Sequence, residues 1–154
     1  MYEYNYKSGY SDNEIAKTIL ASITDGVGLE GTGISGVEDI TVTLQDSEGT
    51  DTDITFTRPQ AMNVYFKVEV TLNSGYTLEL DKIKSTIIDN FKYVLGEKVV
   101  ANDFYAYLNA LESIDYIDTL QVSFDGLTWV NVLSLQYYQY GVVLAENITV
   151  NEAE

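Results

Sequence analysis

The 154-residue sequence contains no cysteine and no histidine. These two absences exclude a disulfide framework and zinc sites built from Cys and His ligands. They also exclude a cysteine nucleophile and any catalytic triad that uses histidine as its base. The absences therefore favour a protein that is not an enzyme and that carries no cofactor.

Basic residues are scarce as well: 8 Lys and Arg stand against 24 Asp and Glu, for a formal charge of −16. Residues 1–60 carry 3 bases and 11 acids and residues 61–154 carry 5 and 13, so each part has a charge of −8. So acidic a surface repels phosphate groups, and we expect no nucleic acid, membrane or small-molecule partner. No basic stretch and apolar run follow Met1, and no run approaches the roughly 20 residues of a membrane helix. We therefore expect neither a signal peptide nor a membrane anchor, and protein partners with basic or apolar patches.

The N-terminal region is predicted to contain a strand and a helix. Aromatic and polar residues alternate over 2–7, which is typical of a strand. Ser11 and Glu14 have the spacing of a capping box, and apolar residues follow at helical intervals. This pattern predicts a helix over 12–24.

A β-hairpin is predicted next, with strands near 40–45 and 53–57 on either side of a turn rich in Asp, Ser and Gly. The only arginine, Arg58, and the only proline, Pro59, then interrupt the pattern. We place a lobe boundary here, which gives a helix and hairpin lobe over 1–60 and a second lobe over 61–154.

The second lobe is predicted to contain a strand, two helices and three more strands, in that order. Their ranges are 62–72, 79–95, 102–113, 117–124, 128–133 and 137–144. We expect Gly96 to end the first helix and Asn102 to cap the second. This order predicts an α+β fold, with a mixed sheet and two helices on one face. A right-handed crossover would make strands 62–72 and 117–124 parallel neighbours.

Strand 62–72 has the clearest alternation in the sequence. Six apolar residues share one face: Met62, Val64, Phe66, Val68, Val70 and Leu72. The residues between them are mostly polar, so the pattern predicts a sheet with one buried face and one wetter face.

Glycines gather in residues 26–36, where the pattern G-x-G-x-x-G occurs twice. In a dinucleotide site a strand precedes these glycines and a helix follows them, so that the helix N-terminus meets the phosphates. Here the predicted order is reversed and acidic residues flank the segment. We therefore interpret it as a flexible or assembly-ordered loop, with Gly28, Gly31 and Gly33 as candidate interface residues.

Four acids surround Gly49 in the predicted hairpin turn: Asp46, Glu48, Asp51 and Asp53. Calcium prefers six to eight oxygen ligands, so these residues are calcium candidates. Their spacing does not match the EF-hand loop, which favours a solvated turn instead. Asp115 and Asp118 are likewise a carboxylate pair, but two acids alone do not define a hydrolase.

Tyrosine is unusually common, with 13 Tyr against 5 Phe and 1 Trp. Tyrosine combines a large apolar ring with a polar tip, which suits protein interfaces. Tyr137, Tyr138 and Tyr140 form one group and are candidate interface residues together with Arg58. A row of exposed aromatic rings is also typical of a carbohydrate-binding surface, and that alternative stays open.

Several segments, in order, resemble the baseplate J-like family. Residues 8–16 are similar to its G-G-x-D-x-E-I-A helix start, with Tyr10 in place of one glycine. Residues 46–49 resemble its D-x-x-G turn and residues 54–59 its F-x-R-P segment. Residues 64–68, 83–99, 103–117 and 147–150 resemble later segments, with Ser113-Ile114 where Gly-Val is usual.

The resemblance implies a structural component of a contractile phage tail baseplate, or of a prophage or related injection machine. Such a wedge protein would pack beside copies of itself and other tail proteins, without catalysis, and would assemble in the bacterial cytoplasm. Members of the family are normally longer, so we expect the lobe over 1–60 to be incomplete. A carbohydrate- or receptor-binding module of a tail or surface protein is the alternative, and a small hydrolase is the second rival.

Overall fold

The computed structural model describes residues 10–22, 33–34, 37–45 and 49–153. The strand expected over 2–7 lies outside the described residues, as do most of the glycine-rich segment and part of the hairpin turn. The chain divides into two compact units, Met1–Arg58 and Pro59–Glu154. The elements together form an α+β fold, as the sequence predicted.

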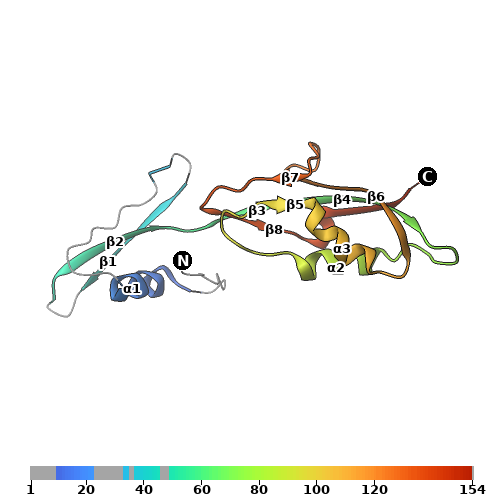
Figure 1. Ribbon diagram of the computed structural model, residues 1–154. Coiled ribbons are helices and arrows are strands. Elements are labelled where there is room, and N and C mark those ends of the chain that lie inside the picture. The colour runs from blue at the N-terminus through green and yellow to red at the C-terminus, as the bar shows by residue number, and fades with distance from the viewer. Residues whose placement is uncertain (1–9, 23–32, 35–36, 46–48, 154) are drawn as a thin grey trace. The chain divides into compact units, whose positions relative to one another are not determined.

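The first unit contains helix α1 (Asp12–Ser22) and an antiparallel hairpin of β1 (Asp39–Gln45) and β2 (Asp51–Thr57). Alternate residues of β1 are half-buried because the helix packs against both strands (Figure 1). Ala16 of α1 and Ile54 of β2 are almost fully buried. The hairpin therefore gains the apolar cover that an isolated pair of strands lacks.

The second unit is organised around β4 (Tyr65–Leu72). Its inward residues Phe66, Val68 and Val70 are fully buried and Leu72 is partly buried, so the predicted alternation is confirmed. The expected single strand is, however, interrupted at Val64: the preceding β3 (Gln60–Asn63) pairs in parallel with β8 (Gln139–Val142) in a separate two-stranded sheet. A side-chain alternation shows which face is buried and carries no information on which strand is the partner.

Strand β4 lies between β6 (Ile114–Ser123) and β9 (Ile148–Glu152) in a mixed sheet. It pairs antiparallel with β6 and parallel with β9, so the expected parallel pairing with the strand over 117–124 is wrong. The helical excursion, the segment between β4 and β6, leaves and rejoins the sheet at the same end of β4. The amide of Asn73 at its start donates to the carbonyl of Ser113 at its end, at 3.0 Å. A crossover would instead have returned the chain to the opposite end of β4.

The excursion consists of α2 (Leu80–Asn90), the short strand β5 (Val99–Val100), a 3-10 turn η1 (Ala101–Phe104) and α3 (Tyr105–Asn109). The buried residues of both helices, Ile83, Ile87 and Leu108, join the same core as the inward residues of β4. Figure 1 shows the two helices side by side. No helix in the described part of the chain is long and apolar enough to cross a membrane.

The two expected helix boundaries around the β5 region are wrong. Helix α2 ends at Asn90, and Gly96 instead occupies a turn with a φ of +66°. A side chain there would bring its Cβ to 2.9 Å from the Tyr137 Cα, so close backbone packing requires the glycine. Asn102 is not a cap but lies inside η1, which follows Val100 without a side-chain cap.

The C-terminal strands are shorter than expected. The segment over 128–133 forms only β7 (Val132–Leu133), which pairs antiparallel with β5, and a single bridge joins Val130 to Val122. The segment over 137–144 contributes the four residues of β8. A short 3-10 turn, η2 (Ala145–Asn147), leads into β9.

We predict that Phe66→Ala destabilises the protein by about 3–5 kcal/mol, because it removes a fully buried ring and leaves a cavity. The Phe66 ring packs edge-on against Phe91 and Phe104, with centroids 6.2 and 5.0 Å away. The free energy of unfolding in urea is the measurement, and Tyr116→Ala on an exposed position of β6 is the control. A loss for Phe66→Ala no larger than for the control would contradict this core.

Candidate interaction surfaces

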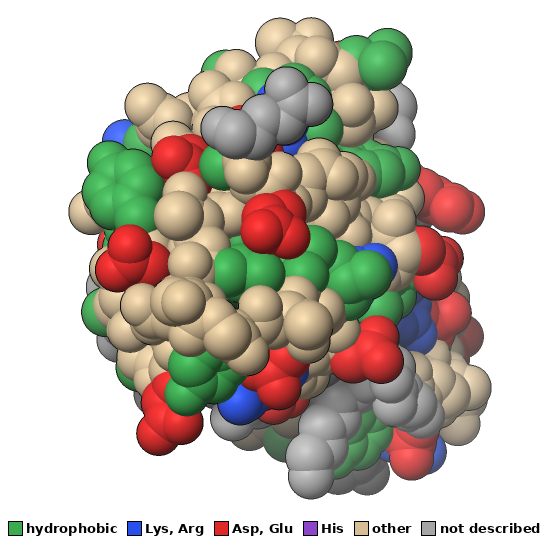
Figure 2. All heavy atoms as spheres, turned by 90° about the vertical axis from the view of Figure 1, so that its right-hand side faces the viewer, with side chains coloured by type: hydrophobic (Ala, Val, Ile, Leu, Met, Phe, Trp, Pro, Cys, Tyr) green, Lys and Arg blue, Asp and Glu red, His purple; other side chains and the backbone are tan. Residues whose placement is uncertain are grey.

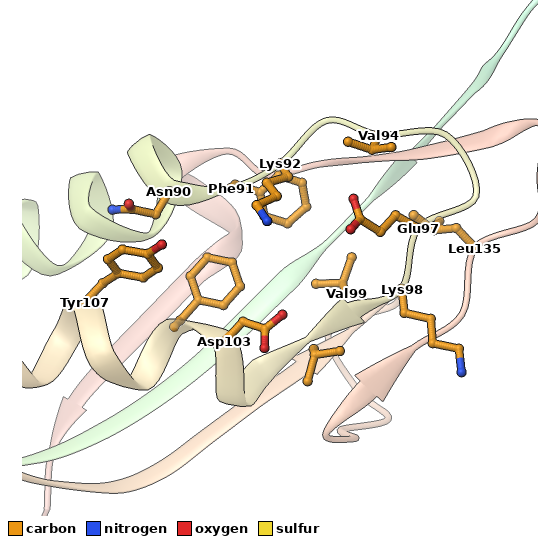
Figure 3. A pocket seen from close by; sticks show the side chains of 12 residues that line it. Asn90, Phe91, Lys92, Val94, Glu97, Lys98, Val99, Asp103, Tyr107 and Leu135 are labelled. Atoms are coloured by element: carbon orange, nitrogen blue, oxygen red, sulfur yellow. The ribbon is translucent and has the colours of Figure 1, made fainter. Parts of the chain in front are cut away.

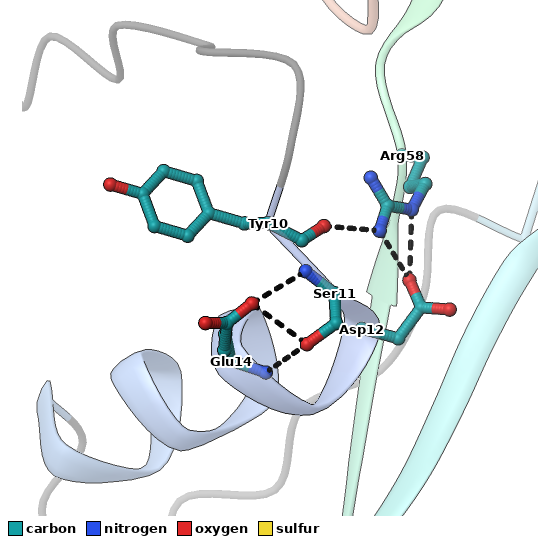
Figure 4. Close-up of polar contacts among 5 residues, drawn as sticks. All are labelled: Tyr10, Ser11, Asp12, Glu14 and Arg58. Atoms are coloured by element: carbon teal, nitrogen blue, oxygen red, sulfur yellow. Dashed lines mark hydrogen bonds and ion pairs between the residues drawn. The ribbon is translucent and has the colours of Figure 1, made fainter.

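The start of α1 is held by a capping box, as predicted (Figure 4). The amide and hydroxyl of Ser11 each donate to Oε2 of Glu14 at 2.8 Å, and the Glu14 amide donates back to the Ser11 hydroxyl at 3.3 Å. The Ser11 backbone amide, followed by its hydroxyl, holds the pKa of Glu14 below its usual value. The helix start is therefore a defined local structure.

Arg58 binds this helix start from the other end of the first unit. Its Nε and Nη2 contact Oδ1 of Asp12 at 2.8 and 2.7 Å, and Nη2 also donates to the carbonyl of Tyr10 at 3.0 Å (Figure 4). The Arg58 side chain is 33% exposed. The structure thus gives this predicted interface residue a contact within its own unit.

The exposed face of the hairpin is lined by threonines and acids. The hydroxyls of Thr41 and Thr55 are 2.9 Å apart, and the Thr43 hydroxyl donates to Asp53 at 2.6 Å. Asp53, a calcium candidate, is therefore engaged by its cross-strand neighbour, while Asp51 lies at the exposed start of β2. The other two candidates, Asp46 and Glu48, lie outside the described residues. Among the described residues, no three acids gather in a geometry suited to a metal ion.

Of the three candidate interface glycines, the structure describes only Gly33. It has a φ of +61°, and its amide donates to Oδ2 of Asp39 at 3.3 Å. This amide already has a carboxylate partner, unlike the amides that cradle a phosphate. Gly28 and Gly31 lie outside the described residues.

The tyrosine group at β8 is only partly exposed. Tyr137 is 64% exposed, whereas Tyr138 and Tyr140 are half-buried. The rings of Tyr137 and Tyr138 are 5.2 Å apart and nearly perpendicular, at 89°. These two rings therefore do not form the flat platform on which a sugar ring stacks.

Sequence reasoning missed a hollow of about 360 Å³ beside the end of α2 (Figure 3). Its twelve lining residues come from segments 90–94, 97–100 and 103–107 and from Leu135. Lys92 and Glu97 extend over the hollow, and Lys98 extends away from it. Neither lysine has an ion-pair partner among the described residues. Residues far apart in the sequence build this site, so no local motif marks it.

Sequence reasoning also missed the turn that follows β6, which we name the Leu127 turn (residues 123–128). The carboxylate of Asp125 accepts hydrogen bonds from the amides of Leu127 and Thr128 at 2.8 and 2.7 Å and from the Ser123 hydroxyl at 2.7 Å. The Thr128 amide, the Ser123 hydroxyl and the Leu127 amide, in that order, hold the pKa of Asp125 well below its usual range. This ordered turn presents Leu127, which is 83% exposed.

One sequence signal does coincide with these surfaces. Residues 126–145 contain no charged side chain, although 21% of the whole chain is charged. This uncharged segment includes Leu127 and Tyr137, and it contributes Leu135 to the hollow. On the face shown in Figure 2, acidic side chains are spread among fewer basic ones.

Comparisons of the chain with protein-family models and with curated proteins found no match. Function must therefore be inferred from the residues themselves. The described surfaces contain two hydrogen-bonded motifs, the capping box and the Leu127 turn, and exposed apolar side chains such as Leu127 and Tyr137.

We predict that the Arg58–Asp12 pair contributes about 0.5–1 kcal/mol of coupling energy, the range of partly exposed ion pairs. The measurement is a double-mutant cycle of Arg58→Met and Asp12→Asn on the free energy of unfolding. Lys17→Met, an exposed change on the same helix, is the control. Strict additivity of the two substitutions would show that the pair does not stabilise the first unit.

We predict that Asp125→Asn lowers stability at neutral pH, because the carboxylate accepts several hydrogen bonds in the folded state. A depressed folded-state pKa stabilises the fold above the unfolded-state value, about 3.9, and this contribution is lost as pH falls below it. The difference in urea midpoint between wild type and variant should therefore shrink in acid. A difference independent of pH, or one as small as that of exposed Asp115→Asn, would contradict the prediction.

Proposed function

We propose that this chain is a structural component of a contractile phage tail baseplate, or of a prophage or related injection machine. It acts through protein–protein contacts in the baseplate wedge and catalyses no reaction. The observation that carries the proposal is the order of the segments that resemble the baseplate J-like family, which extends over nearly the whole sequence.

A contact between two of these segments supports the proposal. Residues 8–16 and 54–59 each resemble a family motif, and Arg58 of the second binds Asp12 and Tyr10 of the first. These two segments are distant in the sequence, and the contact joins them within one folded unit. The resemblance therefore concerns a structural unit, which suits a scaffold function.

The chemistry of the chain also suits a scaffold. Without histidine or cysteine, the commonest acid–base and nucleophilic groups are missing. Of the carboxylate pair considered for hydrolysis, Asp118 accepts a hydrogen bond from Thr71 at 2.9 Å, and both acids are exposed on β6. Neither acid lines the hollow described above, so the pair has no cleft there in which to hold a substrate. Basic or apolar surfaces of neighbouring tail proteins are the partners that this acidic chain would bind, and assembly would take place in the bacterial cytoplasm.

A carbohydrate- or receptor-binding function is supported less well. Its sign would be a row of aromatic rings along a groove, and the perpendicular rings of Tyr137 and Tyr138 do not provide one. The test below nevertheless separates the two functions.

The proposal predicts that deleting the gene from its genome abolishes particles with complete baseplates in electron micrographs. A plasmid copy should restore them, and gold-labelled antibodies against a tagged chain should mark the baseplate end of the tail. The matched control is the same deletion complemented with an empty plasmid.

Normal, unlabelled particles from the deletion strain would contradict the proposal. If the purified chain also bound one class of glycan saturably on an array, the carbohydrate-binding function would replace it.

A further inference from the structure

The hollow beside the end of α2 is large enough to receive a side chain of another molecule. Its volume of about 360 Å³ falls within the roughly 300–1,000 Å³ of ligand sites. Phe91, Val99 and Phe104 are its buried lining residues on the side of the core, together with Leu135. The rings of Phe91 and Phe104 are stacked at an interplanar angle of 22°, with centroids 6.2 Å apart. Two aromatic rings thus contribute to its inner wall.

The outer wall of the hollow carries hydrogen-bond acceptors. Glu97 and Asp103 contribute exposed carboxylates from two different segments, and Figure 3 shows them on different sides of the hollow. Neither carboxylate has an ion-pair partner among the described residues. Tyr107 adds a hydroxyl, which can also accept a hydrogen bond. A group that has several donors and no acceptor therefore suits this wall.

The charge around the hollow selects a cation as its occupant. The two acids, Glu97 and Asp103, are opposed by Lys92 alone, because Lys98 extends away from the hollow (Figure 3). The whole chain, at −16, attracts basic proteins and repels acidic surfaces, including further copies of itself. The local excess of acids and the charge of the chain thus favour the same kind of partner.

We propose that the hollow binds an arginine side chain presented by a neighbouring protein of the assembly. The inference rests on the assembly role proposed above and names the chemistry of one partner. The guanidinium group pairs with the carboxylates of Glu97 and Asp103 and lies against the aromatic wall of the hollow.

Arginine suits this hollow better than lysine does. A guanidinium group is planar, has only donors, and presents them in a fork that matches carboxylates. It is more weakly hydrated than an ammonium group and stacks on aromatic rings such as those of Phe91 and Phe104. Its aliphatic stem can pack on Val94 and Leu135, which also line the hollow. Arginine is, in addition, enriched at protein interfaces.

Amide chemical shifts of the full chain, recorded by NMR while the peptide acetyl-Gly-Arg-Gly-amide is added, test the proposal. We expect saturable shifts concentrated in residues 90–107 and at Leu135, which line the hollow. The same peptide with citrulline in place of arginine keeps the shape without the charge and should bind about tenfold more weakly. The lysine peptide should bind more weakly too, and so should methylguanidinium, because it lacks the aliphatic stem.

Variants of the hollow provide the sharper test. Glu97→Gln combined with Asp103→Asn should weaken binding of the arginine peptide about tenfold or more, because both charged acceptors are lost. The matched control is Asp81→Asn combined with Asp89→Asn, which removes two exposed acids from α2 and should leave the affinity nearly unchanged. Circular dichroism confirms that each variant is folded.

Lys92→Gln should act in the opposite direction. It removes the base that extends over the hollow and should strengthen binding of the arginine peptide about threefold. Lys84→Gln, the same change on α2, is its control. A gain of affinity cannot result from partial unfolding, so this variant keeps the test valid even if the acidic double variant does not fold.

Equal binding of the arginine and citrulline peptides, or equal losses in the acidic double variant and its control, would overturn the proposal. Tighter binding of methylguanidinium than of the peptide would overturn the assignment to a protein side chain. These results leave the baseplate function untouched, because gold labelling of tails tests it separately. Saturable binding of the arginine peptide together with unlabelled tails would instead reject the baseplate function and keep the site.

Discussion

Strand β4 is the constraint on which the second unit depends. It is hydrogen-bonded along both edges, to β6 and to β9, and the inward residues Phe66, Val68 and Val70 are fully buried. Its two faces contact different parts of the unit. On one face Phe66 packs on the rings beside the hollow, and on the other Tyr65 lies against the Leu127 turn. Moving this strand would therefore displace both the hollow and the Leu127 turn.

The excess of acids is the second constraint, and it acts on the surface. Three of the carboxylates with local partners, at Glu14, Glu69 and Asp125, have a pKa below the usual value because hydroxyls or amides donate to them. These three carboxylates therefore stay ionised to a lower pH in the folded protein than they would without these donors. A net charge of −16 makes copies of the chain repel one another in solution.

The sequence predicted those features that depend on neighbouring residues. The capping box of Ser11 and Glu14 and the alternation along β4 are local patterns, and both are confirmed. The direction of β6 depends on where the excursion ends, a relation between Asn73 and Ser113 that no periodicity contains. Gly96 shows the same limit, because its need for glycine comes from the distant backbone of Tyr137.

The candidate surfaces also combine features that the sequence indicates locally with features that only the fold brings together. The sequence singled out Tyr137 and Arg58 as candidate interface residues, but it did not predict that Arg58 binds Asp12. The hollow combines three segments with Leu135, and exposure of Leu127 follows from the turn that Asp125 holds. The sequence does contain the uncharged segment 126–145. Only the fold shows that Leu135 of this segment lines the hollow and that Leu127 is exposed.

The central claim is that strand β4 holds the second unit together through hydrogen bonds along both of its edges. Native-state hydrogen exchange tests this claim most directly, because amides that open only on global unfolding exchange most slowly. We expect the amides of β4 to exchange at the rate set by global unfolding. Exchange of the β4 amides as fast as that of the Leu127 turn would contradict the claim.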